Sequence, residues 1–226
     1  MIIKQEVFMT KVGIIGATGM AGSATFKAAQ EAGLDVTAIV RNADKAKQNL
    51  GANIQLIESD AFNLTKSDLE QFDVVVDAFA TAPEKAYLHT DLATHLVATL
   101  RETESPRLIF ILGAGSTFVG TGDQRHFAYE DIKADPNNAA WQSIPENQLY
   151  EFNFLKDVKN VSWTGVSPGQ LFVPGELADK VLYGKDDMLF DEQGRSQTTS
   201  DTMAKAIVDE IITPAHKQER FIVTNG

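Results

Sequence analysis

Short apolar segments alternate along the chain with longer segments in which apolar residues recur at helical spacing. Segments of the first kind predict buried strands, and segments of the second kind predict the helices that cover them. The expected strands are residues 12–15, 36–40, 54–57, 73–76, 108–112, 161–166 and 220–223. Regular alternation of strands and helices is typical of an α/β fold, here a doubly wound parallel sheet with helices on both faces.

Several of the expected helices carry recognisable ends. Gly33 follows the segment 20–32 at the position where helices commonly end. Thr65 and Asp68 form a capping-box pattern that predicts a short helix. The other helices are expected at residues 43–49, 83–100, 145–158 and 201–212.

Two segments lack a regular pattern and are expected to be irregular. Residues 113–140 are polar, and residues 167–175 contain two prolines and two glycines. Because 226 residues suit one large α/β domain, we expect a single domain over residues 1–226. Within it, the nucleotide-binding core would span about residues 10–160, and a small C-terminal substrate lobe would span about residues 167–226.

The first expected strand leads into Gly13, Gly16 and Gly19 and then into the first expected helix. This order of strand, glycine-rich turn and helix is how a Rossmann fold presents a helix N-terminus to the pyrophosphate of a dinucleotide. We expect Gly13 to let the strand turn, Gly16 to let the backbone approach phosphate, and Gly19 to let the helix pack closely. The alternative is a glycine-rich turn that only reverses the chain. The residues expected at the phosphates are Gly13, Gly16, Ala17, Thr18, Gly19 and Met20.

The end of the second expected strand indicates which nicotinamide nucleotide binds. An acid usually stands there to bind the ribose of NAD, but this chain has Arg41. A guanidinium group suits the 2′-phosphate of NADP, so the sequence predicts that NADP is preferred and that NAD is an alternative. The competing interpretation makes Arg41 a solvated charge opposite Asp44.

Residues after the third and fourth expected strands are predicted to contact the rest of the cofactor. Asp60, followed by Ala61, would accept a hydrogen bond from the adenine amino group; the alternative is an aspartate that caps a turn. Ala78, Phe79 and Ala80 would run past the cofactor ribose, although the phenylalanine could equally fill the core.

Two sets of residues are candidates for the chemistry itself. Ser116 follows the fifth expected strand and could donate a hydrogen bond beside the nicotinamide; the alternative is a loop serine that satisfies backbone groups. Tyr129 and Lys133 match the Tyr-x-x-x-Lys pattern of an acid and its pKa-lowering partner. That pattern needs a helix, and the flanking residues suit a loop, so we interpret the match as coincidental.

Composition narrows the function classes further. The net charge of −11 disfavours nucleic acid and anionic membranes as partners. The absence of cysteine excludes disulfides, thiolate catalysis and cysteine zinc sites, and no histidine–carboxylate spacing suggests a metal site. Residues 1–8 lack the apolar stretch of a signal peptide, so a cytoplasmic protein is expected. Met9 is an alternative start, which would make residues 1–8 a leader without functional weight.

Several stretches together carry a family resemblance, namely residues 13–22, 36–42, 162–168 and 174–176. They resemble the atypical short-chain dehydrogenase/reductases of the NmrA-like, NAD(P)H-binding type, especially small bacterial proteins named as NADH-flavin reductases. The similarity extends from about residue 11 to the C-terminus. It implies a Rossmann domain with a small C-terminal lobe, a glycine motif at Gly13, Gly16 and Gly19, and an arginine for the adenosine phosphate at Arg41.

The resemblance also implies an activity. Relatives with biliverdin or flavin reductase activity work without an active-site tyrosine–lysine pair. We therefore expect an NADPH-preferring oxidoreductase that transfers hydride to a small acceptor such as a quinone or a flavin, with FMN or FAD as substrate. One alternative is a non-catalytic NmrA-like redox sensor that binds a protein partner, and another is a sugar-nucleotide epimerase or dehydratase. The oligomeric state is left open.

Overall fold

The computed structural model describes residues 9–226 of the chain. Residues 1–8, for which the sequence predicted no signal peptide and which would be a leader if Met9 were the start, lie outside the described residues. Within residues 9–226, no helix combines the length and the apolar character needed to span a membrane.

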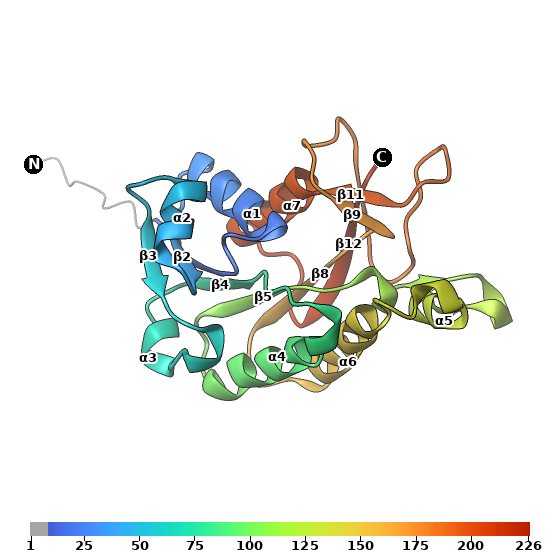
Figure 1. Cartoon of the computed structure of the whole chain (residues 1–226), viewed down its shortest axis with the longest axis horizontal. Helices are drawn as coiled ribbons and strands as arrows, with labels where there is room; N and C mark the ends of the chain where they lie inside the picture. Colours follow the sequence, from blue (N-terminus) through green and yellow to red (C-terminus); the bar gives the residue numbers. More distant parts are fainter. Residues whose placement is uncertain (1–8) are drawn as a thin grey trace, which may run out of the picture.

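Eight strands form the central sheet (Figure 1): β1 (Lys11–Ile15), β2 (Asp35–Val40), β3 (Gln55–Glu58), β4 (Val74–Asp77), β5 (Arg107–Ile111), β8 (Trp163–Pro168), β10 (Val181–Gly184) and β12 (Glu219–Asn225). Across the sheet they lie in the order β10-β12-β8-β5-β4-β1-β2-β3. All neighbours are parallel except β10, which pairs antiparallel with β12 at the edge. The predicted doubly wound parallel sheet is confirmed, and β10 is the strand of this sheet that the sequence analysis did not predict.

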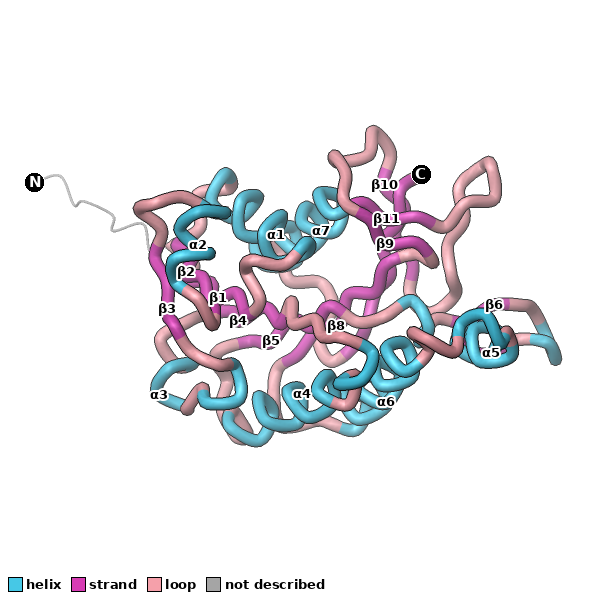
Figure 2. Tube along the Cα trace, viewed as in Figure 1, coloured by secondary structure: helices cyan, strands magenta, loops and turns pink. Residues whose placement is uncertain are grey.

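Helices cover both faces of the sheet, as Figure 2 shows from the same side. They are α1 (Met20–Glu31), α2 (Ala43–Leu50), α3 (Lys66–Leu69), α4 (Leu88–Thr99), α5 (Ala128–Ala134), α6 (Ser143–Asp157) and α7 (Ser200–Ile212). The helices α1 and α7 pack together on one face, and α4 and α6 pack together on the other. The capping box predicted before α3 is present, because the backbone N–H of Thr65 donates to Asp68 Oδ2 at 2.8 Å.

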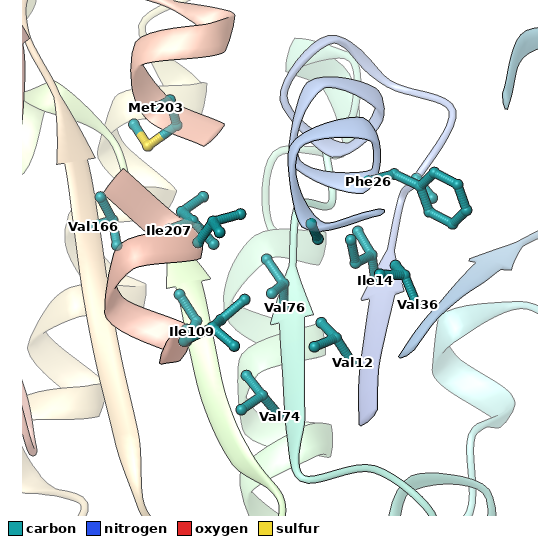
Figure 3. Packing of buried hydrophobic residues seen from close by; sticks show 14 of the residues in the cluster. Val12, Ile14, Phe26, Val36, Val74, Val76, Ile109, Val166, Met203 and Ile207 are labelled. Carbon is teal, nitrogen blue, oxygen red and sulfur yellow. The ribbon is translucent and has the colours of Figure 1, made fainter. Parts of the chain in front are cut away.

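Side chains that alternate along each strand divide the apolar core between the two faces. In β4, Val74 and Val76 pack in the layer that contains Phe26 of α1 and Ile207 of α7 (Figure 3), whereas Val75 packs in the layer under α4 and α6. Burying one such valine contributes about 2 kcal/mol. Because β4 is covered on both faces, its sequence is a continuous apolar run rather than an alternating one.

The structure differs from the prediction of one continuous helix over residues 83–100. A short 3₁₀ turn, η2 (Pro83–Lys85), comes first, and α4 begins only at Leu88. In η2 the N–H of Ala86 bonds to the carbonyl of Pro83, three residues back, which is tighter than an α-helical bond. Proline suits the first turn of either helix type, so its position alone did not separate the two.

The prediction of irregular structure over residues 113–140 was wrong in part. This segment contains a small hairpin of β6 (Phe118–Val119) and β7 (His126–Phe127), followed directly by α5. The rings of Phe118 and Phe127 stack with their centroids 4.4 Å apart. At the start of α5, the carboxylate of Glu130 accepts the N–H of Phe127 at 3.3 Å. The aromatic contact joins two strands of only two residues each, which are too short to show a strand pattern in the sequence.

Residues 167–226, expected to form a small lobe, are shared between two parts of the structure. The elements α7, β10 and β12 belong to the main sheet and its cover. By contrast, β9 (Leu171–Val173) and β11 (Gln197–Thr199) pair in parallel as a separate two-stranded sheet. β9 lies inside the segment 167–175 that was expected to be irregular. Its hydrogen-bonding partner is remote in sequence, which is why the local composition was misleading.

Candidate cofactor-binding site

A tight turn joins the end of β1 to the start of α1. Gly16 adopts φ +73°, a left-handed conformation that other residues rarely adopt. A Cβ atom at Gly16 would stand 2.6 Å from the carbonyl oxygen of Ala78, beyond the end of β4. The backbone therefore passes so close to the segment after β4 that only glycine fits.

The first turn of α1 has the features of an anion-binding helix end. Gly19 is its N-cap and offers no side chain to bond the free N–H groups, and the first turn carries no acidic residue. A Cβ at Gly22 would stand 2.2 Å from the carbonyl oxygen of Gly16, so the helix rests directly on the turn. Unpaired N–H groups and the helix dipole together favour a negatively charged ligand at this point.

The structure corrects the roles that the sequence analysis gave to the glycines. Gly13 lies within β1 and does not turn the strand; a Cβ there would stand 2.9 Å from the ring of Phe72. The turn is made at Gly16, and close packing of helix on turn is provided by Gly22. The same Gly-x-x-Gly-x-x-Gly spacing fits Gly16, Gly19 and Gly22, which is the set that the sequence could have indicated.

A cavity of about 490 Å³ opens beside this turn, at the carboxyl ends of β1 to β4. We call it the main cavity. It is lined by Ile15, Gly16, Thr18, Gly19, Ile39, Val40, Arg41, Lys45, Ser59, Asp60, Ala61, Phe62, Ala78, Phe79, Ala80, Thr81, Lys85 and Leu88. In the sheet, β1 has β2 on one side and β4 on the other, so the cavity lies where the strand order reverses direction. Ligands of open α/β sheets bind at this kind of crevice.

Most residues that the sequence analysis singled out for the cofactor lie together in the main cavity. Those that line it are Gly16, Thr18, Gly19, Arg41, Asp60, Ala61, Ala78, Phe79 and Ala80. Three others, Gly13, Ala17 and Met20, are not part of its lining. Two lining cations, Lys45 and Lys85, were missed. Lys45 lies four positions after Arg41, across the start of α2, and this spacing was the signal available for it.

At the end of the main cavity near β2, the positions of Arg41 and Lys45 are set by the first turn of α2. Asn42 caps the helix by accepting the N–H of Lys45 at 2.7 Å, and Arg41 precedes it. Arg41 is exposed, and among residues 9–226 no ion pair involves it, so both its role at a 2′-phosphate and the alternative of a solvated charge stay predictions. The carboxylate of Glu58, on β3, accepts the N–H of Ala43 at 3.0 Å and so also serves the start of α2.

Asp60 and Phe79 each have the structural role that the sequence left open, and both also line the main cavity. Asp60 Oδ1 accepts the N–H of Phe62 at 3.1 Å, which makes it a turn cap, and the residue also lines the main cavity. Phe79 lines the cavity as well, while its ring meets those of Phe62 and His89 edge-on, with centroids 6.0 Å and 5.5 Å away. Whether these residues contact the cofactor stays a prediction.

Ser116 is not brought to the main cavity. Its side chain is fully buried, and its hydroxyl donates to the carbonyl of Gly113 at 2.8 Å. The guanidinium of Arg220 lies on the other side, with Nη1 3.3 Å from the same hydroxyl. The geometry corresponds to the alternative interpretation, a loop serine that satisfies buried polar groups, and gives no support to a role beside the nicotinamide.

Tyr129 and Lys133 lie on α5, so the expectation that they belong to a loop was wrong. The ammonium group of Lys133 stands 5.8 Å from the centre of the Tyr129 ring. The tyrosine is nevertheless buried, away from the main cavity. Burial and the neighbouring carboxyl of Glu146 raise its pKa, whereas a tyrosine that acts as a general acid at neutral pH needs a lowered one. The geometry therefore does not make the pair catalytic.

Comparisons with known proteins agree with this geometry. Residues 16–214 match the model of the NAD(P)H-binding family. The YwnB protein of Bacillus subtilis is 35% identical over 216 residues, which cover 95% of this chain and 98% of that protein.

Two solved structures are similar over almost their whole length. A protein from Lactobacillus casei is 36% identical, with a TM-score of 0.88 over 96% of this chain and 100% of that one. A candidate NADH-flavin reductase from Streptococcus pneumoniae is 28% identical, with a TM-score of 0.85 over 96% of this chain and 100% of that one. These findings confirm the resemblance seen in the sequence, and the chain belongs to the NAD(P)H-binding family.

Proposed function

We propose that this protein is an NADPH-dependent reductase that transfers hydride to a small planar acceptor such as a flavin or a quinone. One observation carries the proposal. The main cavity joins the uncapped N-terminus of α1 at one point with two cations at another, Arg41 directly after β2 and Lys45 on α2. A dinucleotide with an extra phosphate on its adenosine ribose has negative charge at both of these places.

The residues of the main cavity fit such a nucleotide along its length. A Cβ at Gly22 would stand 2.2 Å from the carbonyl oxygen of Gly16, so the turn lies directly against the helix end, as a phosphate site requires. Arg41 and Lys45 would hold the 2′-phosphate, because β2 ends at Val40 and is followed by Arg41, without an acidic residue to bind the ribose. Asp60 and Ala61 would lie beside the adenine, and Ala78 to Ala80 would follow the ribose on the other side.

The chain's own contribution to the reaction is binding and orientation. The bound nicotinamide supplies the hydride, and the protein fixes its position and excludes water around it. Neither Tyr129 nor Ser116 lies in the main cavity, so no tyrosine or serine of the predicted set supplies a proton there. Reduced flavins and quinones take up their protons from water, which is why acceptors of this class need neither Tyr129 nor Ser116 as a proton donor.

The relatives support a reductase without fixing its acceptor. The Streptococcus pneumoniae structure, 28% identical, is described as a candidate NADH-flavin reductase. This agrees with the acceptor class proposed from the site. The preference for NADPH over NADH is our own inference from Arg41 and Lys45.

The test combines binding with turnover. Tryptophan fluorescence of the purified protein is followed while NADPH is added, and then FMN, FAD or a quinone is added while the nicotinamide absorbance is recorded. We expect saturable binding of NADPH and a loss of absorbance that depends on both protein and acceptor. Binding without turnover for every acceptor would favour a redox sensor, and the absence of binding would refute the site itself.

A further inference from the structure

Three titratable side chains are buried next to the segment after β4 that lines the main cavity: Asp77, Glu151 and His89. Asp77 is the last residue of β4 and directly precedes the cavity-lining segment 78–81. Glu151 belongs to α6 and His89 to α4, the two helices that pack on this face of the sheet. Their exposed fractions are 6% for Asp77, 3% for Glu151 and 5% for His89. The proposed function uses none of the three.

Asp77 is tied to the wall of the main cavity. Its Oδ1 accepts the backbone N–H of Phe79 at 2.9 Å, so the carboxylate fixes the first residues of the cavity-lining segment. Burial raises the pKa of Asp77 to about 6, with the Phe79 hydrogen bond opposing the shift. The group therefore carries a negative charge at neutral pH. Its neighbours on β1 and β5 are Ile15 and Phe110, which bring no charge.

Glu151 and His89 do not neutralise that charge. Glu151 Oε2 has no hydrogen-bond partner, and none of the ion pairs within residues 9–226 includes this residue. Burial, and then the charge of Asp77, raise the pKa of Glu151 well above its usual value. A carboxylate so isolated would be very unfavourable, so Glu151 holds a proton. Burial lowers the pKa of His89 to about 4, which leaves its ring neutral.

Asp77 is thus the one charged residue among the three. The order of strands in the sheet indicates which part of the cofactor would lie nearest to it. The uncapped end of α1 follows β1, and the cations of the main cavity's adenosine end follow β2. β4 lies on the opposite side of β1, between β1 and β5 (Figure 2). A dinucleotide whose pyrophosphate lies at α1 and whose adenosine lies over β2 and β3 extends its nicotinamide towards β4 and β5.

We propose that the buried carboxylate of Asp77 makes this protein bind the oxidised, positively charged nicotinamide more favourably than the neutral reduced ring, while Glu151 remains protonated. This inference rests on the proposed function, because it assumes the nucleotide orientation given there. A fixed negative charge in a poorly solvated place stabilises positive charge that appears nearby. Loss of hydride places a positive charge on the nicotinamide ring, so Asp77 would favour hydride donation without touching the acceptor.

The test is the ratio of two dissociation constants, that of NADP⁺ divided by that of NADPH. Both are measured by calorimetric titration of the whole protein between about pH 5 and pH 8, a window that spans the raised pKa of Asp77. Both nucleotides carry the same phosphates, so titration of the 2′-phosphate cancels in the ratio. Protonation of Asp77 should weaken the binding of NADP⁺ alone. We expect the ratio to rise about tenfold as the pH falls through 6.

Two substitutions and a matched control separate the roles of the carboxyls. Asp77→Asn keeps an oxygen to accept the Phe79 N–H but removes the charge, and we expect it to show the high ratio at every pH. Glu151→Gln imitates a protonated glutamate and should leave the ratio within about twofold of the unaltered protein at pH 7.5. Asp73→Asn is the control, because Asp73 lies just before β4, at the end of the strand away from the cavity. Its carboxylate accepts the N–H of Lys11 at 2.8 Å, and its loss should leave the ratio of dissociation constants unchanged.

The outcomes distinguish the two proposals. If the unaltered protein binds neither nucleotide, the proposed function fails. If both nucleotides bind but the ratio of the unaltered protein is independent of pH, or Asp77→Asn keeps the original ratio, the role of Asp77 is refuted while the proposed function stands. A rise of the ratio in Glu151→Gln without one in Asp77→Asn would also refute it. Should Asp77→Asn fail to fold, the pH profile of the unaltered protein decides alone.

Discussion

The carbonyl oxygen of Ala78 lies 2.6 Å from the position that a Cβ atom on Gly16 would occupy. This contact joins the turn after β1 to the segment after β4, and both line the main cavity. The cavity's shape therefore depends on a glycine at this one position.

Gly16→Ala should consequently weaken nucleotide binding. The added Cβ would clash with the backbone of Ala78, and alanine also disfavours the left-handed φ of this position. Because the turn must move, we expect the free energy of unfolding to fall by about 2 kcal/mol. The affinity for NADPH should fall about tenfold or more, because the N-terminus of α1 would be displaced from the phosphate that it binds. Gly33→Ala is the control, because Gly33 has φ +78° but nothing within 4 Å of an added Cβ. It should lose stability and keep its affinity; equal losses of affinity in both variants would contradict this account.

Tyr129→Phe should retain activity. The ring lies outside the main cavity, and its hydroxyl has a raised pKa because of burial and Glu146. Removing the hydroxyl should reduce the free energy of unfolding by about 1 kcal/mol and leave the turnover number within about twofold. Steady-state rates with the best acceptor, together with urea unfolding, check both numbers. A fall of a hundredfold or more, as for an essential general acid, would show that the tyrosine–lysine pair is catalytic.

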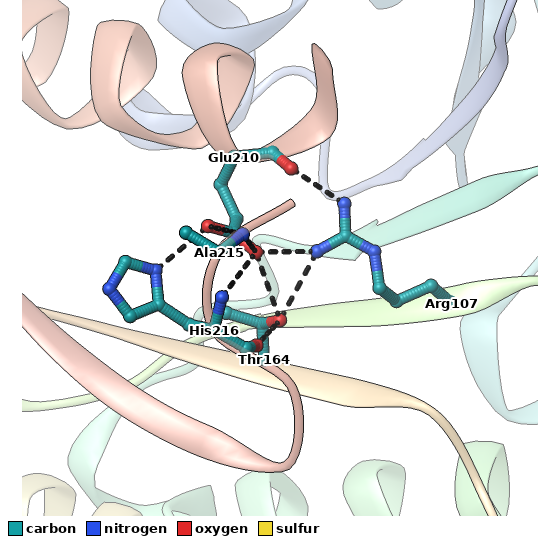
Figure 4. A network of polar contacts seen from close by, with 5 residues as sticks. All are labelled: Arg107, Thr164, Glu210, Ala215 and His216. Atoms are coloured by element: carbon teal, nitrogen blue, oxygen red, sulfur yellow. Dashed lines mark hydrogen bonds and ion pairs between the residues drawn. The ribbon is translucent and has the colours of Figure 1, made fainter. Parts of the chain in front are cut away.

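Glu210→Gln should destabilise the protein at the amino-terminal ends of the central strands β5 and β8, away from the main cavity. The buried carboxylate of Glu210 accepts from Arg107 Nη1 at 2.8 Å and faces His216 Nδ1 at 2.8 Å (Figure 4). Breaking a buried pair leaves the arginine charge uncompensated, so we expect a loss of about 3 kcal/mol at pH 7, measured by urea unfolding.

The pH dependence of that loss follows from the direction of the pKa shift. Burial by itself would raise the pKa of Glu210, but hydrogen bonds from His216 and Ala215 and the charge of Arg107 outweigh it, so the pKa is lowered. A lowered carboxyl pKa stabilises the fold above the unfolded value, and this stabilisation disappears as the pH falls through the folded value. The difference between the variant and the original should therefore shrink below about pH 4.5. A difference that is independent of pH would show that the network acts through shape alone.

Asp77→Asn should have the opposite effect on stability. The pKa of Asp77 is raised to about 6, chiefly by burial, from 3.8. Its charged form is thus disfavoured in the folded protein, and stability falls as the pH rises from about 4 to about 6. At pH 7.5 the variant should be more stable than the original by on the order of 2 kcal/mol, and the two should converge near pH 4. Thermal unfolding across this range measures the difference; a less stable variant at pH 7.5 would mean that the carboxylate is structurally favourable.

The fold was predictable because its signals are local. The valines of β4 form a continuous apolar run since both faces are covered, and Thr65 with Asp68 forms the predicted capping box. By contrast, β9 and β11 are held by hydrogen bonds between segments far apart in sequence, and their own residues include no periodic pattern. The hairpin before α5 was missed as well, because the stacked rings of Phe118 and Phe127 belong to two short strands, neither of which has a pattern of its own.

The site was predictable in its outline, and its electrostatics were not. Arg41 and the glycine turn are recognisable from their place after a strand, although the sequence analysis assigned the turn to Gly13 instead of Gly16. Lys85 lines the main cavity because it belongs to the short turn η2. The sequence pattern predicted a continuous helix there and so gave no indication of this position. Glu151 is a charged residue on a helix, which a sequence alone would place at the surface. Only the structure shows that it is buried near Asp77.

The measurement that tests the central claim most directly is the pair of dissociation constants for NADPH and NADH, in the original protein and in Arg41→Gln. We predict that the original binds NADPH at least about tenfold more tightly than NADH, because a guanidinium group holds the 2′-phosphate. Arg41→Gln should lose most of that preference and leave NADH binding unchanged, whereas Lys47→Gln, a substitution on α2 outside the main cavity, should keep it. Equal affinities in the original protein, or an unchanged preference in Arg41→Gln, would contradict an NADPH site built around Arg41.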